Sequence, residues 1–252
     1  LQNPHPPLWM ACTNRDTIKV AAQNGIGALA FSFLDPDEAK AWSKIYYDII
    51  KSEECVPLGW SVNANLAMVS AFSMHEDRTE AIRRGQDNFE FFRYSQQKLV
   101  AEDFVPGYSN MWNEFKEKRG DASDRLIQAA LSRAEYDGAG IGTPDDMARH
   151  LRNFQDVGID QVIFLQQAGR NTNQNIRESL ELFAETVMPD FTKDVEEREA
   201  KKATELAPYI EAALNRKEYM QPMSREEVPV VKAAVKAATF DAQKMRQAAG
   251  DD

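Results

Sequence analysis

The chain has few of the residues that build metal centres and disulfide frameworks. Its 252 residues include only two cysteines and three histidines. Cys12 and Cys55 are too few and too far apart for a disulfide framework or a zinc site, and His5, His75 and His150 lack the spacing of metal ligands. We therefore expect no metal site and a reducing, cytoplasmic compartment.

Positive charge and long apolar runs are also scarce. The chain carries 30 Lys and Arg against 40 Asp and Glu, a net charge of -10. Because proteins bind nucleic-acid phosphates through clusters of Lys and Arg, this balance argues against nucleic acid as a partner. No run is apolar enough to span a bilayer, and no signal peptide opens the chain, so we expect no membrane association.

The stretch 139–170 predicts a helix followed by a buried strand. Thr143 is placed to cap the helix, Pro144 fits its first turn, and apolar residues then recur at steps of three and four until Gly158 ends it. The run VIFLQ follows without polar alternation. Such a run needs cover on both faces, which is typical of parallel strands in α/β proteins.

Three earlier segments repeat this pattern of a strand and a helix. We expect strands near residues 7–11, 27–33, 64–73 and 161–166. The helices that follow them are expected at Thr13–Asn24, at about 38–52, from about 78 through about 94, and at about 175–187. Four strands, each followed by a helix, make half of an eight-stranded (β/α) barrel, and the right-handed crossover rule makes them parallel.

The expected organisation is an α/β fold with a helical tail. Residues 1–190 would form the C-terminal half of a (β/α)8 barrel, with a variable insertion at about 99–139. Residues 191–252 are rich in Ala, Glu, Lys and Arg and predict a charged helical C-terminal extension, broken at Pro208. Since Leu1 lies in what looks like the lead-in to a strand, we expect the chain to be part of a longer protein. The open edges of half a barrel also predict a homo-oligomer.

Several segments together resemble a known enzyme family. PHPPLWMACTNRDTIKVAAQNGIGALAFSF, VSAFSMHED, IGTPDDMARHLRNFQDVGIDQVIFLQQAGRN and ESLELFAETVMPDF are similar, in order and spacing, to the C-terminal half of bacterial luciferase-like flavin-dependent monooxygenases, over residues 4–191. The resemblance implies a TIM barrel that binds reduced FMN at the C-terminal ends of its strands and uses molecular oxygen to oxidise a small organic substrate. It also implies a flavin reductase that supplies the reduced flavin.

The resemblance limits what this chain can do alone. The family's catalytic histidine belongs to the N-terminal half of the barrel, outside this chain, so the resemblance implies that the fragment alone is inactive. The remaining residues would orient the cofactor and exclude water, because oxygen activation is the chemistry of the flavin itself.

The FMN phosphate is expected at the first junction between a strand and a helix. Free backbone N–H groups and the helix dipole make such a corner attractive to phosphate, and the family holds its phosphate at the same corner. Cys12, Thr13 and Thr17 are therefore the predicted cofactor-binding residues. The alternative is that Thr13 is only a helix N-cap and Thr17 a solvated helical residue.

Other candidate site residues follow the remaining strands. Gln167 and Arg170 could bind the flavin edge or an anionic group of the substrate, although Gln167 is equally explained as the polar end of a buried strand. Phe33 could form a wall for the substrate or pack in the core. His75 could donate a proton to the substrate, with a pKa raised by the neighbouring acidic residues, or simply begin a helix.

Two other functions stay open on the sequence alone. A close variant of the enzyme would use a deazaflavin and transfer a hydride without oxygen. The chain could also be a non-catalytic half-barrel that serves as an interaction subunit for another chain.

Overall fold

The computed structural model describes residues 5–31, 36–101, 105, 107–120, 140–218, 224 and 226. The chain divides into two units, Leu1–Lys217 and Glu218–Asp252, and the elements below belong to the first. Its strands are β1 (Trp9–Cys12), β2 (Gly27–Ala30), β3 (Leu66–Ala71), β4 (Ser73–Met74), β5 (Ile141–Gly142) and β6 (Gln161–Leu165). Its helices are α1 (Arg15–Gln23), α2 (Pro36–Ile50), α3 (Arg78–Ala101), α4 (Met111–Arg119), α6 (Pro144–Asp156), α7 (Asn173–Thr186), α8 (Met188–Thr192) and α9 (Val195–Asn215).

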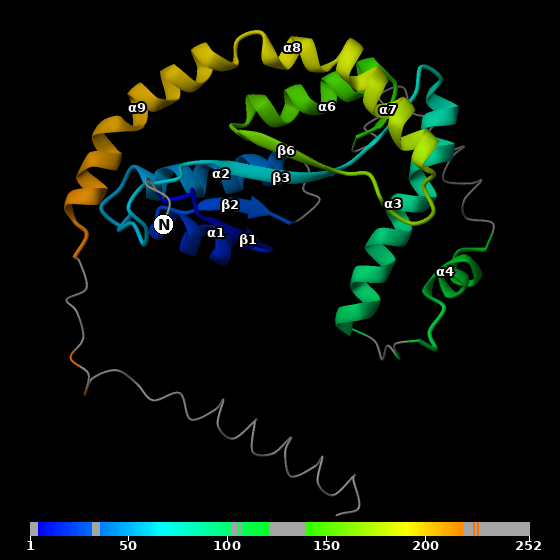
Figure 1. The fold of residues 1–252 in the computed structure, drawn as a ribbon, viewed down its shortest axis with the longest axis horizontal. Coiled ribbons are helices and arrows are strands. Elements are labelled where there is room, and N and C mark those ends of the chain that lie inside the picture. Colours follow the sequence, from blue (N-terminus) through cyan, green and yellow to red (C-terminus); the bar gives the residue numbers. More distant parts are fainter. Residues whose placement is uncertain are drawn as a thin grey trace, which may run out of the picture. The chain divides into compact units, whose positions relative to one another are not determined.

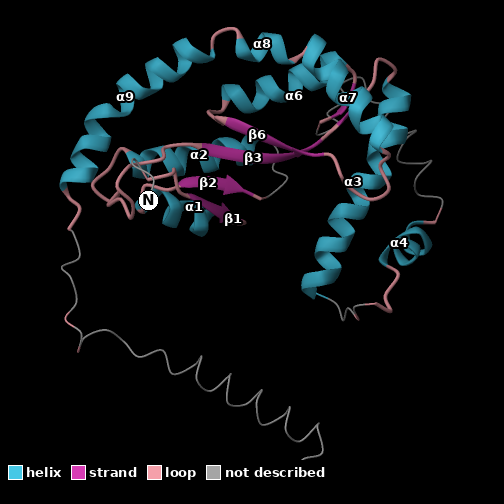
Figure 2. Cartoon of the chain, viewed as in Figure 1, coloured by secondary structure: helices cyan, strands magenta, loops and turns pink. Residues whose placement is uncertain are grey.

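Four strands form one parallel sheet in the order β1-β2-β3-β6 (Figure 1). Cys12 on β1 pairs with Ala30 on β2, Ala30 pairs with Met68 on β3, and Met68 pairs with Val162 on β6. These four residues form one row across the sheet. The predicted parallel strands and their order are therefore confirmed, with each strand shorter than predicted by one to four residues. Figure 2 shows the same alternation of strands and helices along the chain.

One face of the sheet is covered by helices. Cys12, Ala30 and Met68 lie on it and pack in a core with Ile18 of α1 and Tyr46 of α2. Burying this face supplies the main stabilisation of the unit, because apolar burial is the dominant favourable term in folding.

The opposite face of the sheet is apolar and only partly covered. Val69 of β3 is buried, but its partner Ile163 on β6 is 40% exposed, and Phe31, just after β2, is 39% exposed. Both β1 and β6 pair with a single strand among the described residues. The unit thus presents an apolar face between two open strand edges, which is a feature of sites of association.

The predicted third strand is divided in the structure. β3 ends at Ala71, and β4 pairs in parallel with β5 instead, an interaction that the sequence analysis missed. Gly140 has φ +93° and lies so close to the strand that a Cβ atom there would be 2.1 Å from the carbonyl oxygen of Ala71. Ser73 then donates its backbone N–H to the Gly140 oxygen at 3.0 Å. The close approach of this glycine explains why the strand changes partner.

The C-terminal helix differs from the prediction at one residue. Pro208 does not break α9, which continues through it from Val195 to Asn215. The helix is held on both sides of the proline, since Leu206 and Ala213 are buried in the same core as α1 and α2. Tertiary packing here outweighs the cost of about 3 kcal/mol for proline inside a helix.

Candidate functional site

The carboxyl ends of β1, β2 and β6 lie at one edge of the sheet, and two of the predicted site residues, Thr13 and Gln167, follow strands there. Thr13 follows β1, Phe31 follows β2 and Gln166 follows β6. In parallel α/β folds, ligands bind at this edge because the loops there leave the strands without having to form the core.

The corner between β1 and α1 is closed by a capping box. Asn14 is the N-cap, and its side chain accepts the Thr17 backbone N–H at 3.0 Å. The Thr17 hydroxyl oxygen in turn accepts the N–H groups of Thr13 at 3.2 Å and Asn14 at 3.3 Å. The suggestion that Thr13 is the N-cap is therefore wrong, because Asn14 holds that position with its side chain. The role of Thr13 and Thr17 in binding phosphate stays a prediction.

Cys12 lies behind this corner, with its thiol beside the Thr17 side chain. Its side chain is fully buried, and its thiol donates a weak bond to the Met10 carbonyl at 3.4 Å. Burial raises the pKa of the Cys12 thiol, which keeps it protonated and unreactive. Any contact of Cys12 with a ligand would therefore involve its backbone.

An aromatic pair stands at the end of β2. The rings of Phe31 and Phe92 meet edge to face with their centroids 6.4 Å apart. Phe92 comes from α3, so this contact joins two segments that are distant in the sequence, and no sequence pattern predicted it. Phe33 lies outside the described residues.

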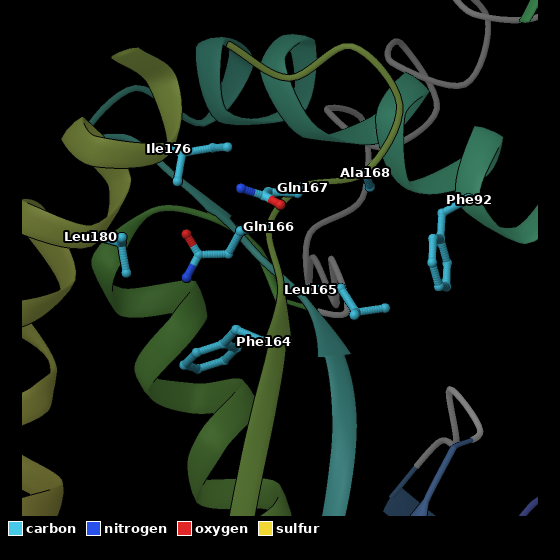
Figure 3. A pocket seen from close by; sticks show the side chains of 8 residues that line it. All are labelled: Phe92, Phe164, Leu165, Gln166, Gln167, Ala168, Ile176 and Leu180. Atoms are coloured by element: carbon cyan, nitrogen blue, oxygen red, sulfur yellow. The ribbon is translucent and has the colours of Figure 1, made fainter. Parts of the chain in front are cut away.

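A hollow of about 470 Å³ lies around the end of β6, and we call it the β6 hollow (Figure 3). Its apolar walls are Phe92, Phe164, Leu165, Ala168, Ile176 and Leu180. The side chains of Phe164 and Leu165 lie on opposite sides of the strand, so the hollow opens around the free edge of β6. Its polar groups come from Gln166 and Gln167. The structure thus places the predicted residue Gln167 in a cavity of the size that holds small ligands.

A much smaller cavity adjoins the β6 hollow, and we call it the amide cavity. It has room of about 10 Å³ and shares Leu165, Gln166 and Ala168 with the hollow. The side-chain oxygens of Gln166 and Asn171 are buried at this place and accept no hydrogen bond. Buried polar atoms normally have partners, so two unpaired oxygens in one small cavity indicate a place for a donor.

Arg170 lies outside the β6 hollow. Its guanidinium carbon is 4.9 Å from the centre of the Trp112 ring of α4, and its backbone N–H donates to the Asn88 side-chain oxygen at 2.7 Å. Gly169 before it has φ +59°, and a Cβ atom there would be 2.5 Å from the same Asn88 oxygen. The loop is therefore fastened to α3, and Arg170 is directed to α4.

His75 takes part in the entry to α3. Its backbone N–H donates to the Gly142 oxygen at 3.2 Å, and its Nδ1 accepts the Asp77 backbone N–H at 3.0 Å. These bonds fit the alternative of a helix-entry residue, and His75 is not among the residues that line the β6 hollow.

A buried carboxylate joins α3 to the start of α6. The Asp146 side chain accepts two bonds from the Arg78 guanidinium, both 2.8 Å, one from Arg149 at 2.5 Å, and one from the Thr143 hydroxyl at 2.9 Å. Burial alone would raise the pKa of Asp146, but the bonds from Arg78, Thr143 and Arg149 outweigh it and lower the pKa to about 2. The predicted cap at Thr143 is confirmed, whereas the pairing with Arg78 was missed.

Two kinds of feature are absent from the described part of the chain. It contains no group of three or more His, Cys, Asp or Glu side chains arranged to hold a metal ion. None of its helices combines the length and the apolar character needed to cross a bilayer.

Comparisons with known proteins find similarity at the level of structure. No family model matches the sequence, and no curated protein does either. The monooxygenase RslO1 from Streptomyces bottropensis matches 76% of this chain with a TM-score of 0.51 and 18% identity. MsnO8 matches 74% with a TM-score of 0.46 and 12% identity, and the coenzyme F420-dependent tetrahydromethanopterin reductase from Methanopyrus kandleri matches 74% with a TM-score of 0.47 and 19% identity.

The likeness to RslO1 shows a shared fold. At 18% identity it shows the fold alone, and the expectation of an α/β unit of four parallel strands with helices is confirmed. The chain spans about half the length of the solved structures that it matches, 50% of RslO1, 52% of MsnO8 and 51% of the reductase.

Proposed function

We propose that the chain is part of a luciferase-like flavin-dependent monooxygenase that uses reduced FMN and molecular oxygen to oxidise a small organic substrate. The β6 hollow carries this proposal, because it is an apolar cavity at the carboxyl end of a parallel strand in a fold shared with a monooxygenase. The sequence resemblance supports the same function, and a flavin reductase would supply the reduced cofactor.

The residues present fit a bound flavin in two places. The β6 hollow offers apolar walls and amide groups, including a buried Gln166 oxygen without a partner, that suit a planar ring with polar edges. None of the described residues that line it carries a charge, so we place the phosphate elsewhere. The corner of Thr13 and Thr17 at the start of α1 is the place we propose, since α1 directs its positive dipole end there.

Bound FMN would supply the electrons and the oxygen chemistry, and the chain would supply position and dryness. Phe31 and Phe92 would offer the ligand an apolar surface, because their rings meet edge to face where β2 ends. Gln166 and Gln167 would orient polar ligand edges by hydrogen bonds. Since the chain spans half the length of RslO1, we expect it to bind ligands without turning over substrate on its own.

An anaerobic titration of reduced FMN tests the proposal. Thr17→Val removes the hydroxyl and keeps the shape, so it should weaken binding by about tenfold if the hydroxyl bonds the phosphate. Thr17→Ser restores the hydroxyl and should restore affinity. Thr204→Val on α9 is the matched control, because the Thr204 hydroxyl also bonds the backbone of its own helix, at 2.8 Å to Ala200.

A loss of affinity through a missing phosphate contact can be told apart from a loss through unfolding of α1, because the helix content is measured independently. Circular dichroism of Thr17→Val shows whether α1 is retained. Equal affinity for reduced FMN in wild type and Thr17→Val, with α1 intact, would remove the phosphate from this corner. A wild-type chain that binds a reduced deazaflavin and not reduced FMN would favour the hydride-transfer alternative.

A further inference from the structure

The loop of residues 166–172 carries the polar groups of the β6 hollow, because Gln166 and Gln167 begin it (Figure 3). It joins the end of β6 to Thr172, the N-cap of α7. A loop fixed only at its two ends would leave these amides free to take several directions. The position of the amides therefore depends on how the middle of the loop is held.

Asn88 of α3 holds the middle of this loop. Its side-chain oxygen accepts the backbone N–H of Arg170 at 2.7 Å. Its side-chain nitrogen donates to the backbone oxygen of Arg84, one turn earlier on α3, at 2.7 Å. Since a carbonyl oxygen can only accept, the second bond fixes the Asn88 amide with its oxygen toward the loop.

Gly169 makes the close approach of the loop to α3 possible. It has φ +59°, a conformation that side chains disfavour. A Cβ atom at this position would lie 2.5 Å from the Asn88 side-chain oxygen and 2.9 Å from the Asn88 Cα atom. The backbone of the loop therefore lies directly against α3, with no side chain of residue 169 between them.

Hydrogen bonds within the loop connect this contact to the amides of the hollow. The Asn171 side-chain nitrogen donates to the Gln166 backbone oxygen at 3.2 Å. The Asn171 backbone N–H donates to the Ala168 oxygen at 3.3 Å. A displacement of the loop away from Asn88 would therefore also displace the backbone that carries Gln166 and Gln167.

We infer that Asn88 is a positioning residue for the flavin ring, and that it acts by holding the 166–172 loop so that Gln166 and Gln167 stay in the wall of the β6 hollow. This inference rests on the proposed function, which places the ring in that hollow. Asn88 is not among the residues that line the hollow, so its effect on the ring passes through the loop. An asparagine with only a structural role would stabilise the fold without changing the affinity for the ring.

Anaerobic titration of the full chain with reduced lumiflavin tests the inference, because this probe has the flavin ring and lacks the phosphate. Asn88→Leu keeps the approximate size of the side chain and removes both of its hydrogen bonds. It should weaken lumiflavin binding roughly two- to tenfold. Asn153→Leu is the matched control and should leave the affinity unchanged, since Asn153 is also a half-buried helical asparagine, on α6, and does not line the hollow.

Gly169→Ala disturbs the same contact from the side of the loop. Gly169 is exposed, so the variant should fold, and the added Cβ atom should push the loop away from Asn88. Its lumiflavin affinity should fall to a similar extent. The double variant Asn88→Leu/Gly169→Ala should bind no more weakly than the weaker single variant, because both changes remove one contact. Additive losses would overturn the inference.

Hydrogen exchange of the Arg170 amide gives a readout without flavin. This amide should exchange roughly two- to tenfold faster in Asn88→Leu than in wild type, since it loses its acceptor. Unchanged exchange at Arg170, or wild-type lumiflavin affinity in Asn88→Leu, would overturn the inference and leave the proposed function standing. A wild-type chain that binds neither reduced lumiflavin nor reduced FMN would refute the proposed function, and the inference with it.

Discussion

Replacing Asp146 by asparagine should remove an acid-sensitive part of the stability. The Asp146 side chain is 4% exposed and is paired with both Arg78 and Arg149. Asparagine keeps the size of the side chain but cannot carry the negative charge that both guanidinium groups meet. The variant therefore isolates the ionisation of one carboxyl group.

The magnitude follows from the pKa. The pKa of Asp146 falls from 3.8 to about 2, a difference of about 1.8, and each pKa unit corresponds to about 1.36 kcal/mol. Ionisation of Asp146 therefore contributes about 2.5 kcal/mol to the free energy of unfolding. Because the folded-state pKa is the lower one, this contribution is complete above about pH 4 and is lost as the pH falls toward 2.

Urea unfolding of wild type and Asp146→Asn at pH 7, 4 and 2.5 measures this contribution. The difference in unfolding free energy between the two proteins should shrink by about 1.5 kcal/mol between pH 7 and pH 2.5. Asp190→Asn is the control, because Asp190 and its partner Arg152 are both 55% exposed and such pairs contribute at most about 1 kcal/mol. A difference for Asp146→Asn that stays constant over this pH range would refute the reasoning.

Two further predictions concern the open edge and the C-terminal helix. Ile163→Lys places a charge on the exposed apolar face of β6, so light scattering should show less self-association than in wild type; a monomeric wild type would contradict this. Lys202→Met removes the ammonium that donates to Asp160 at 2.6 Å, and should lower the unfolding free energy by about 2 kcal/mol. Lys193→Met removes the exposed ion pair with Asp190 and should change the unfolding free energy by less than about 1 kcal/mol. Equal losses of unfolding free energy in the two variants would refute a special role for Lys202.

The elements that the sequence predicted correctly depend on local signals. The cap of α6 needs only Thr143, Pro144 and Asp146, which are neighbours in the chain and form a capping box in the structure. The parallel strands follow from continuous apolar runs separated by helices, and their order follows from the handedness of the crossovers.

The missed features depend on contacts between distant segments. β4 and β5 are two residues long each, and their pairing depends on Gly140 reaching Ala71 across the fold. Pro208 was expected to break a helix because the packing of Leu206 and Ala213 could not be foreseen. At the first helix, Thr13 and Asn14 are both suitable caps, and only the backbone geometry decides between them.

In the candidate site, too, the sequence predicted some residues and missed those that depend on contacts between distant segments. Gln167 was predicted from its place after a strand expected to be buried, and it lines the β6 hollow. The expectation of cover on both faces was wrong, because β6 is an edge strand of the described sheet and is only partly buried. Arg170 was predicted by the same argument, but its stacking partner Trp112 comes from α4, which no pattern linked to this loop. Phe92 and Asn171 were missed because nothing in the sequence shows that a long helix and a loop asparagine meet at the end of β6.

The two ends of the sheet are held in different ways, and this difference supports a site at the carboxyl end. Near the amino end, Asp160 accepts bonds from the Tyr47 hydroxyl at 2.5 Å, the Leu66 N–H at 2.7 Å and Lys202. At the carboxyl end of β6, by contrast, Gln166 leaves a buried oxygen unpaired beside an open hollow. Buried polar atoms normally have a partner, so this oxygen marks a place at the carboxyl end of β6 where a bound water or a ligand donor can pair with it.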